Sequence, residues 1–254
     1  SLREAQIHSR WVDPNNDYEQ NLLQFAQAIL EEKGENEFLK EFLDLQGRVA
    51  YFGALNSLSQ VLLKITSPGI PDFFQGNELW DFSLVDPDNR RPVDFKLRQK
   101  FLNELKTLKA KEEKSLPSQL LSTWKDGRIK LFITYKALQT RKNLSDLFCQ
   151  GEYLPLNITG PRKEYVIAFA RRLEEQWVLT VAGRFFSQLT EPEVSPVGKE
   201  IWRDTFLELP KDAPKEWRDG LFSIPLAIKG RKMALPEIFS RFPMALLIGS
   251  PKNA

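Results

Sequence analysis

The hydrophobic pattern of this chain changes near Gly151, from helical spacing before that residue to alternation after it. Before Gly151, apolar residues recur at intervals of three and four, which is typical of amphipathic helices. After it, short runs rich in β-branched and aromatic residues are separated by Pro, Gly and polar residues, which is typical of antiparallel strands. The switch predicts an α+β architecture, with helices and strands in separate parts of the sequence.

Three helices are expected in the first half of the chain. Asp17 is expected to cap the first, with Gln20 as its reciprocal partner, and Gly34 to end it. The second extends from about residue 36 to residue 64, and the third follows a capping Asp94. The apolar residues expected to form the buried stripe of the second helix are Phe38, Phe42, Leu45, Val49, Phe52, Leu55, Leu58 and Leu62.

The segments between and after these helices contain the candidate strands. Residues 70–74 are short and apolar, and they predict a buried strand between the second and third helices. Residues 129–138 satisfy both the helical and the strand period. Residues 166–170 and 177–181 predict a hairpin and residues 242–248 a final strand, so the second half is expected to be a β domain of the sandwich type.

The composition is that of a globular protein, with 42% hydrophobic and 28% charged residues and a formal net charge of +2. Such a balance argues against nucleic acid and membrane partners, and no apolar run is long enough to span a bilayer. Cys149 is the only cysteine, so we expect a buried, inert thiol in a cytoplasmic protein. No motif indicates a metal or a cofactor. The chain starts without Met and in mid-pattern, which predicts an excised part of a longer protein.

Residues 75–92, called the site loop below, contain the strongest chemical signal. They interleave aromatic rings with carboxylates, amides and two arginines, a mixture that suits a sugar because rings stack on its apolar faces and polar groups pair with its hydroxyls. The loop follows the end of the expected strand, where the active sites of α/β barrels gather. Composition alone favours a structural loop, in which Arg90 and Arg91 pair with the neighbouring aspartates.

Two stretches of sequence carry a family resemblance. Residues 69–78, Gly-Ile-Pro-Asp-Phe-Phe-Gln-Gly-Asn-Glu, resemble the pattern of the alpha-amylase family at its eighth barrel strand. Residues 78–94 are similar, more specifically, to the maltooligosyl trehalose synthases. The resemblance continues in residues 3–11, 56–60, 124–130 and 151–156. It implies that residues 129–138 form a helix.

The resemblance also implies a domain organisation. The α+β fold is expected to be the C-terminal remnant of a (β/α)8 barrel, mainly helices plus the last barrel strand, followed by a helical connector and an all-β, sandwich-like C-terminal domain. The expected bounds are 1–112 for the barrel part, 113–150 for the connector and 151–254 for the β domain. Half a barrel exposes a hydrophobic edge, so we expect self-association or a rearranged helical packing.

The implied function is the isomerisation of the reducing-end α-1,4 bond of a maltooligosaccharide to an α,α-1,1 bond. The family's catalytic carboxylates lie on earlier barrel strands, so no catalytic residue is assigned here, and the chain alone is expected to be inactive. Its expected partners are the maltooligosaccharide and the remainder of its own barrel. Alternatives are an α-glucan hydrolase of the same family and a carbohydrate-binding or structural module. The candidate substrate-binding residues are Phe74, Gln75, Glu78, Trp80, Asp86, Asp88, Arg90 and Arg91.

Two of these candidates have open roles. Trp80 either stacks on a glucose ring or anchors the loop. Arg91 either hydrogen-bonds sugar hydroxyls or orients Asp86.

Overall fold

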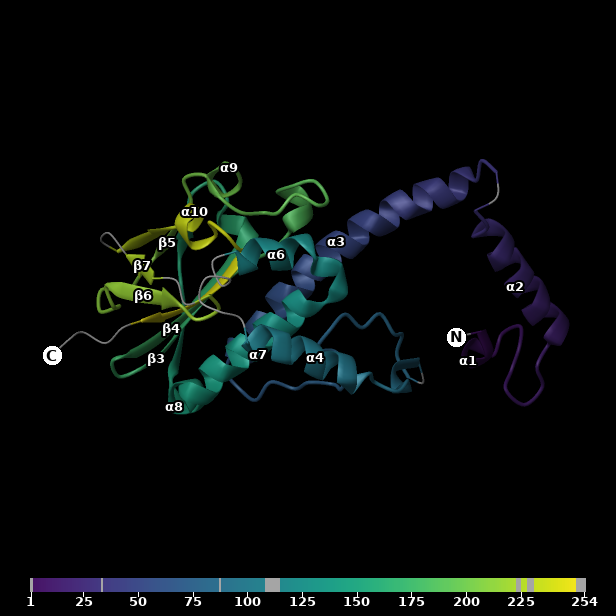
Figure 1. Ribbon diagram of the computed structural model, residues 1–254, viewed down its shortest axis with the longest axis horizontal. Helices are drawn as coiled ribbons and strands as arrows, with labels where there is room; N and C mark the ends of the chain where they lie inside the picture. Colours follow the sequence, from purple (N-terminus) through teal and green to yellow (C-terminus); the bar gives the residue numbers. More distant parts are fainter. Residues whose placement is uncertain are drawn as a thin grey trace. The chain divides into compact units, whose positions relative to one another are not determined.

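The computed structural model describes residues 2–32, 34–86, 88–107, 115–222, 225–227 and 231–249 (Figure 1). The chain divides into two compact units, Ser1–Ala50 and Tyr51–Ala254. The expected boundary between residues 112 and 113 and the loop residue Pro87 lie outside the described ranges. Within those ranges, no helix combines the length and the apolar character that a membrane span requires.

The first unit contains α1 (Leu2–Ala5), α2 (Asn16–Ile29) and the first part of α3 (Glu37–Thr66). The prediction that Asp17 caps α2 is wrong: the cap is Asn15, whose side-chain oxygen accepts a hydrogen bond from the Tyr18 N–H at 3.1 Å. Asparagine is as good a cap as aspartate, and Asp17 lies in the first turn, where its charge still favours the helix.

The buried stripe predicted for α3 is correct for the second half of the helix and wrong for the first half. Phe52, Leu55, Leu58 and Leu62 are at most 7% exposed, whereas Phe38, Phe42, Leu45 and Val49 are 43–63% exposed. Periodicity identifies an apolar face but does not supply the neighbour that covers it. In the first half of α3, the buried apolar residue is Leu39, which the predicted stripe did not include.

Residues 70–74 form no strand, so the predicted last barrel strand is absent from this structure. A strand exists only when its N–H and C=O groups pair with a neighbouring strand. No strand within the described ranges pairs with this segment, and Ile70 is 95% exposed. The apolar composition of the segment was therefore insufficient to define its conformation.

The second unit begins with the rest of α3 and continues through further helices, of which α4 and α7 contact the site loop. Asp94 caps α4 as predicted, accepting a hydrogen bond from the Leu97 N–H at 2.9 Å. The helix implied at residues 129–138 is confirmed, and Ile129 to Thr134 are buried on every side, so both periods fit the sequence. These helices are α4 (Phe95–Lys106), α6 (Leu116–Ser122), α7 (Arg128–Asn143) and α8 (Ser145–Gln150), with 3-10 turns at Asp88–Arg90, Trp124–Asp126, Lys163–Tyr165 and Phe186–Gln188.

Cys149 on α8 is exposed, so the prediction of a buried thiol is wrong. The helix is short and buries Leu147 and Phe148, which leaves the next position on the solvent side.

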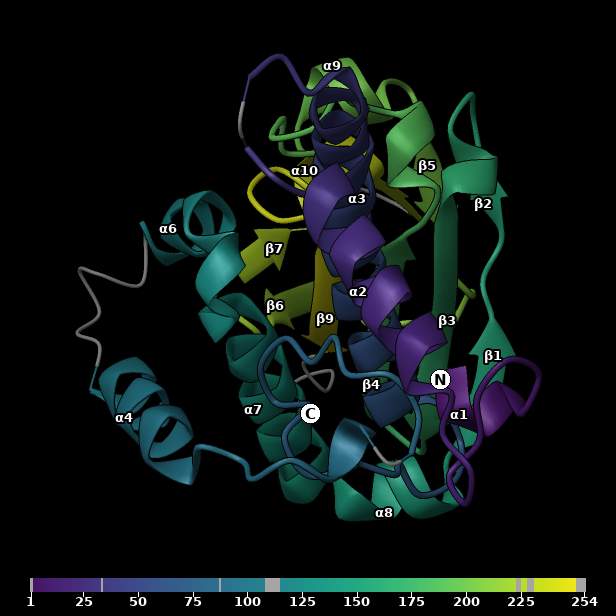
Figure 2. The same cartoon turned by 90° about the vertical axis from the view of Figure 1, so that its right-hand side faces the viewer.

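Two antiparallel sheets follow α8 (Figure 2). The predicted hairpin and final strand are confirmed: β3 pairs with β4 from Val166–Gly183 to Leu173–Gln176, and β9 pairs with β4 on its other side. The larger sheet has the order β1 (Glu152–Pro155), β3 (Val166–Leu173), β4 (Gln176–Gly183), β9 (Met244–Gly249), β6 (Glu216–Asp219) and β7 (Pro225–Ala227), and the smaller has β2 (Ile158–Thr159), β5 (Phe206–Glu208) and β8 (Lys232–Ala234). Short helices α9 (Lys199–Trp202) and α10 (Leu235–Ile238) interrupt the strands, so this region is not entirely β. The sandwich arrangement stays a prediction.

The larger sheet carries the core against which the helices of the second unit pack. Strand β4 is buried from Trp177 to Gly183. The Ser59 hydroxyl on α3 donates to the Gly183 carbonyl at 2.8 Å, and the Phe132 ring of α7 stacks on Phe222 with centroids 5.0 Å apart. Helices α3 and α7 are therefore fixed to the β region, and they form the base on which the site loop rests.

Candidate functional site

The first part of the site loop is held by α4. The Arg98 guanidinium donates to the Glu78 carboxylate at 2.9 Å and also to the Gly76 carbonyl. The same carboxylate accepts from the Gly76 N–H at 3.1 Å. Gly76 has φ +96°, and a Cβ there would lie 3.1 Å from the Val93 side chain, so this tight turn requires glycine. Glu78 is thus a half-buried, paired carboxylate in a fixed turn.

The next two residues, Leu79 and Trp80, are held by the start of α7 and the turn before it. The Trp80 indole N–H donates to the Trp124 carbonyl at 2.6 Å, and the two indole rings meet edge to face with centroids 6.4 Å apart. A Cβ at Gly127 (φ +80°) would lie 3.1 Å from both the Leu79 Cβ and the Trp80 nitrogen, so the backbones approach closely. These contacts favour the anchoring role for Trp80.

The tip of the loop is held by local contacts. Arg90 pairs with Asp86 at 2.8 Å, Arg91 pairs with Asp88, and Asp88 accepts from the Leu84 N–H at 2.8 Å. We call Asp86, Asp88, Arg90 and Arg91 the ion-pair turn. The arginines thus pair with the aspartates, as the structural interpretation of this loop predicted. In this structure Arg91 pairs with Asp88 rather than with Asp86.

Hydrogen bonds favour the ionised form of three aspartates in the loop. The Ser83 hydroxyl lowers the pKa of Asp81, and the Arg90 guanidinium lowers the pKa of Asp86. The Leu84 N–H lowers the pKa of Asp88. A carboxyl group with a lowered pKa is a poor general acid near neutral pH. These groups suit hydroxyl recognition better than proton donation.

Several aromatic and apolar side chains of the loop region face solvent. Phe74 is 48% exposed and Phe82 is 78% exposed, and Gln75 is also exposed. Leu84 and Val85 are 67% and 85% exposed. The eight predicted site residues thus fall into three groups. Glu78 and Trp80 are fixed to α4 and to the turn before α7, four residues form the ion-pair turn, and Phe74 and Gln75 are exposed.

Three residues that fix the loop were not predicted from the sequence: Arg98, Trp124 and Lys130. Trp124 and Lys130 stand in a stretch that carried the family resemblance, so a signal existed there without a role. Arg98 had no signal, because its partner Glu78 is 20 residues away and the pairing depends on how α4 packs.

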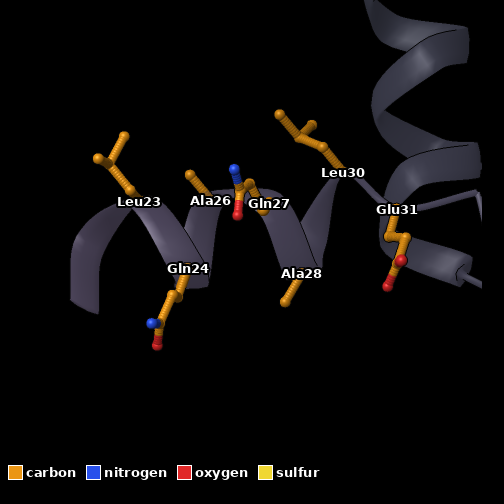
Figure 3. A pocket seen from close by; sticks show the side chains of 7 residues that line it. All are labelled: Leu23, Gln24, Ala26, Gln27, Ala28, Leu30 and Glu31. Carbon is orange, nitrogen blue, oxygen red and sulfur yellow. The ribbon is translucent and has the colours of Figure 1, made fainter. Parts of the chain in front are cut away.

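The described residues offer little for a metal or a small ligand elsewhere. No group of three or more His, Cys, Asp or Glu side chains within those ranges could hold a metal ion. A hollow of about 710 Å³ lies on α2, and in Figure 3 Leu23 and Leu30 point to the same side of the helix beside it. None of the residues that line it is a predicted site residue.

Comparison with known proteins adds the family context. No family model matches the sequence. In two strains of Mycobacterium tuberculosis, a protein provisionally named maltooligosyl trehalose synthase is 30% identical over 248 residues, which is 98% of this chain and 27% of that protein. This chain is homologous to one part of the maltooligosyl trehalose synthases. The resemblance inferred from the loop and its flanking motifs is thereby confirmed.

Solved structures of maltooligosyl trehalose synthases agree with this relationship. The enzyme from Arthrobacter ramosus aligns with a TM-score of 0.72 at 27% identity, and a second solved maltooligosyl trehalose synthase with 0.65 at 28% identity. Each alignment covers 98% of this chain and 29% of the solved one. The chain therefore spans less than a third of the relatives it matches.

Proposed function

We propose that this chain supplies a substrate-binding wall and the C-terminal β region of an enzyme that converts maltooligosaccharides to maltooligosyl trehalose. The reaction moves the reducing-end glucose from an α-1,4 to an α,α-1,1 bond, so the enzyme is an intramolecular glycosyltransferase of the (1->4)-alpha-D-glucan 1-alpha-D-glucosylmutase class. The observation that carries the proposal is the similarity to maltooligosyl trehalose synthases over 98% of the chain, which includes the site loop.

The chemistry explains why we assign no catalytic residue to this chain. Retention at the transferred sugar requires a carboxylate nucleophile and a carboxylic acid about 5–5.5 Å apart across the bond. Glu78, Asp86 and Asp88 are instead paired with arginines, and the lowered pKa values of the two aspartates oppose proton donation. We place the catalytic carboxylates in the part of the relatives that this chain does not cover, and we expect the chain alone to be inactive.

The exposed and anchored residues of the loop have different proposed roles. Phe74 and Gln75 are exposed and supply ring stacking and an amide for hydroxyls. Glu78 and Trp80 hold the loop against neighbouring elements and so fix the shape of the binding wall. The ion-pair turn presents oriented charged groups to sugar hydroxyls. A rigid wall of this kind would also confine the freed glucose and exclude water, which favours transfer over hydrolysis.

A second proposed partner is the remainder of a (β/α)8 barrel. The first half of α3 exposes Phe38, Phe42 and Val49, and α2 exposes Phe25 and Leu23. Leu23 lies beside the hollow in Figure 3. Apolar helix faces of this size normally pack against another layer. The single cysteine fits a protein of the cytoplasm, where we place the enzyme.

The proposal is tested on the chain and on a longer protein. Maltopentaose should bind the chain without being converted. When the coding region upstream of Ser1 is expressed with it, the product should be a non-reducing sugar of unchanged size. Shorter reducing sugars would instead identify the α-glucan hydrolase. Binding that persists after Phe74→Ala, with no activity in the longer protein, would favour a carbohydrate-binding module.

A further inference from the structure

Lys130 on α7 is a buried cation beneath the site loop. Lys130 is 8% exposed, and its ammonium group donates a hydrogen bond to the Leu79 carbonyl at 3.2 Å. The ammonium also lies 5.7 Å from the centroid of the Trp80 ring. Burying a charge is costly unless it makes contacts that need it. One contact is with Leu79 and the other is with Trp80, so both are with adjacent residues of the site loop.

Burial is the largest cost of keeping Lys130 charged, and one of the neighbouring charges adds to it. Burial and the like charge of Lys64 on α3 lower the pKa of Lys130, and the loop carboxylates Asp81 and Glu78 oppose that shift. Within the described residues, these carboxylates act through space and form no salt bridge with Lys130. A Met side chain would fill the same volume without this cost, so packing alone does not explain a lysine here.

The contacts of Lys130 are with residues 79 and 80, and three other residues also hold this part of the loop. Trp124 accepts the Trp80 indole N–H from one side, and Gly127 lets the start of α7 approach Leu79. Arg98 fixes the adjacent Glu78 from α4. Lys130 adds a charged donor to the Leu79 carbonyl, which lies between Glu78 and Trp80 in the chain. Removing that donor would leave the carbonyl without this partner in a buried setting.

We propose that Lys130 is a positioning residue that holds Leu79 and Trp80 in place, so that the site loop presents a fixed surface to a maltooligosaccharide. This inference rests on the proposed function for its ligand, but the positioning itself concerns this chain alone. Lys130 acts through Leu79 and Trp80, without touching the sugar.

The first experiment measures the position of Trp80. For the unaltered chain and for each variant, the emission of Trp80 is obtained as the difference between the fluorescence spectra measured without and with the additional change Trp80→Phe. Lys130→Met should shift that emission to longer wavelength, because the indole gains access to water, whereas Lys130→Arg should largely preserve it. Lys142→Met, at an exposed position of the same helix, is the matched control and should leave it unchanged. A folded Lys130→Met chain with unchanged Trp80 emission would overturn the proposal.

An alkaline titration of the unaltered chain does not depend on whether the variant folds. The Trp80 emission should shift as Lys130 loses its proton, at a pH below the usual 10.5 of a lysine. Lys64 is the like charge that acts on Lys130, so Lys64→Met is the control and should keep the transition. A transition that disappears in Lys64→Met would overturn the assignment to Lys130.

Sugar binding separates this inference from the proposed function. If both are correct, Lys130→Met should weaken maltopentaose binding about tenfold, as expected for one charged hydrogen bond, and Lys130→Arg should restore most of it. If the unaltered chain does not bind maltopentaose while Lys130→Met still shifts the Trp80 emission, the proposed function fails and the positioning role stands. Unchanged affinity in a Lys130→Met chain with displaced Trp80 would refute the link between the two.

Discussion

At the scale of single residues, the buried carboxylate of Asp219 makes the stability of the folded chain depend on pH. Its side-chain oxygen accepts from the Leu221 N–H at 2.7 Å and the Phe222 N–H at 3.4 Å, and it is 8% exposed. Burial raises the pKa of Asp219 from 3.8 to about 6, and the two backbone N–H groups and the charge of Lys136 oppose this shift only in part. The folded state therefore binds this proton more tightly than the unfolded state does.

We predict that this proton makes the folded chain lose stability as the pH rises. The contribution of Asp219 is fully present below pH 3.8 and is lost as the pH passes through about 6. The loss is at most about 3 kcal/mol. Asp219→Asn should flatten this part of the profile in urea unfolding between pH 4 and pH 8, while the exposed Asp146→Asn should leave it intact. A profile that is identical in Asp219→Asn would contradict the prediction.

Single residues also mark the limit of prediction from the sequence. Asp94 was correctly predicted as a cap because capping depends on neighbours three residues away. Asn15 was missed because three suitable caps, Asn15, Asn16 and Asp17, are consecutive in the sequence, and backbone geometry decides which of them caps the helix. Arg98 and Lys130 could not be predicted, because their partners come from packing between distant segments.

At the scale of elements, Arg171 on β3 connects three parts of the second unit. Its guanidinium donates to the carbonyls of Phe148 at 3.0 Å and Gly151 at 2.8 Å, at the end of α8, and to the Thr66 carbonyl at 3.5 Å, at the end of α3. Cations at helix C-termini are favourable because the carbonyls there lack partners within the helix. Arg171 is 2% exposed, so the carbonyls that it contacts are shielded from bulk solvent.

We predict that Arg171→Met destabilises the chain by about 3 kcal/mol, because buried carbonyls lose their charged donor. The adjacent Arg172 pairs with the exposed carboxylates Glu152 and Asp212, so Arg172→Met should cost less than about 1 kcal/mol. The two variants are compared by urea denaturation. Equal losses would show that burial of Arg171 is unimportant.

Elements were predicted well where local pattern determines them and poorly where a partner does. The hairpin of β3 and β4 has its own partner within 20 residues and was recovered from the sequence. Residues 70–74 have strand-like composition but no strand beside them within the described ranges, and they form no regular secondary structure. The same dependence on a neighbour explains why the stripe of α3 is covered in one half only.

At the scale of the whole molecule, the exposed apolar faces have a consequence for solution behaviour. Helix α2 exposes Leu23 and Phe25, and the first half of α3 exposes Phe42, Leu45 and Val49. Apolar patches of this kind lead to association when no partner covers them.

We predict that the chain self-associates as its concentration rises, which sedimentation velocity would detect. Phe25→Ser with Phe42→Ser should shift it towards the monomer, because both side chains lie on the exposed faces. Val194→Ser, which removes a single exposed apolar side chain elsewhere, is the control and should change nothing. A monodisperse monomer at high concentration would contradict this expectation.

The two halves of the site loop differ in how far away their partners lie, and this matters for redesign. Trp80 and Glu78 depend on residues 44 and 20 positions away, whereas every hydrogen bond cited for the ion-pair turn spans three or four positions. The conformation of the tip therefore depends on its own residues, whereas the first part of the loop depends on distant segments. We therefore expect that the tip can be exchanged for another sequence while Glu78 and Trp80 are kept, so that sugar selectivity changes without a change in the helices that hold the loop.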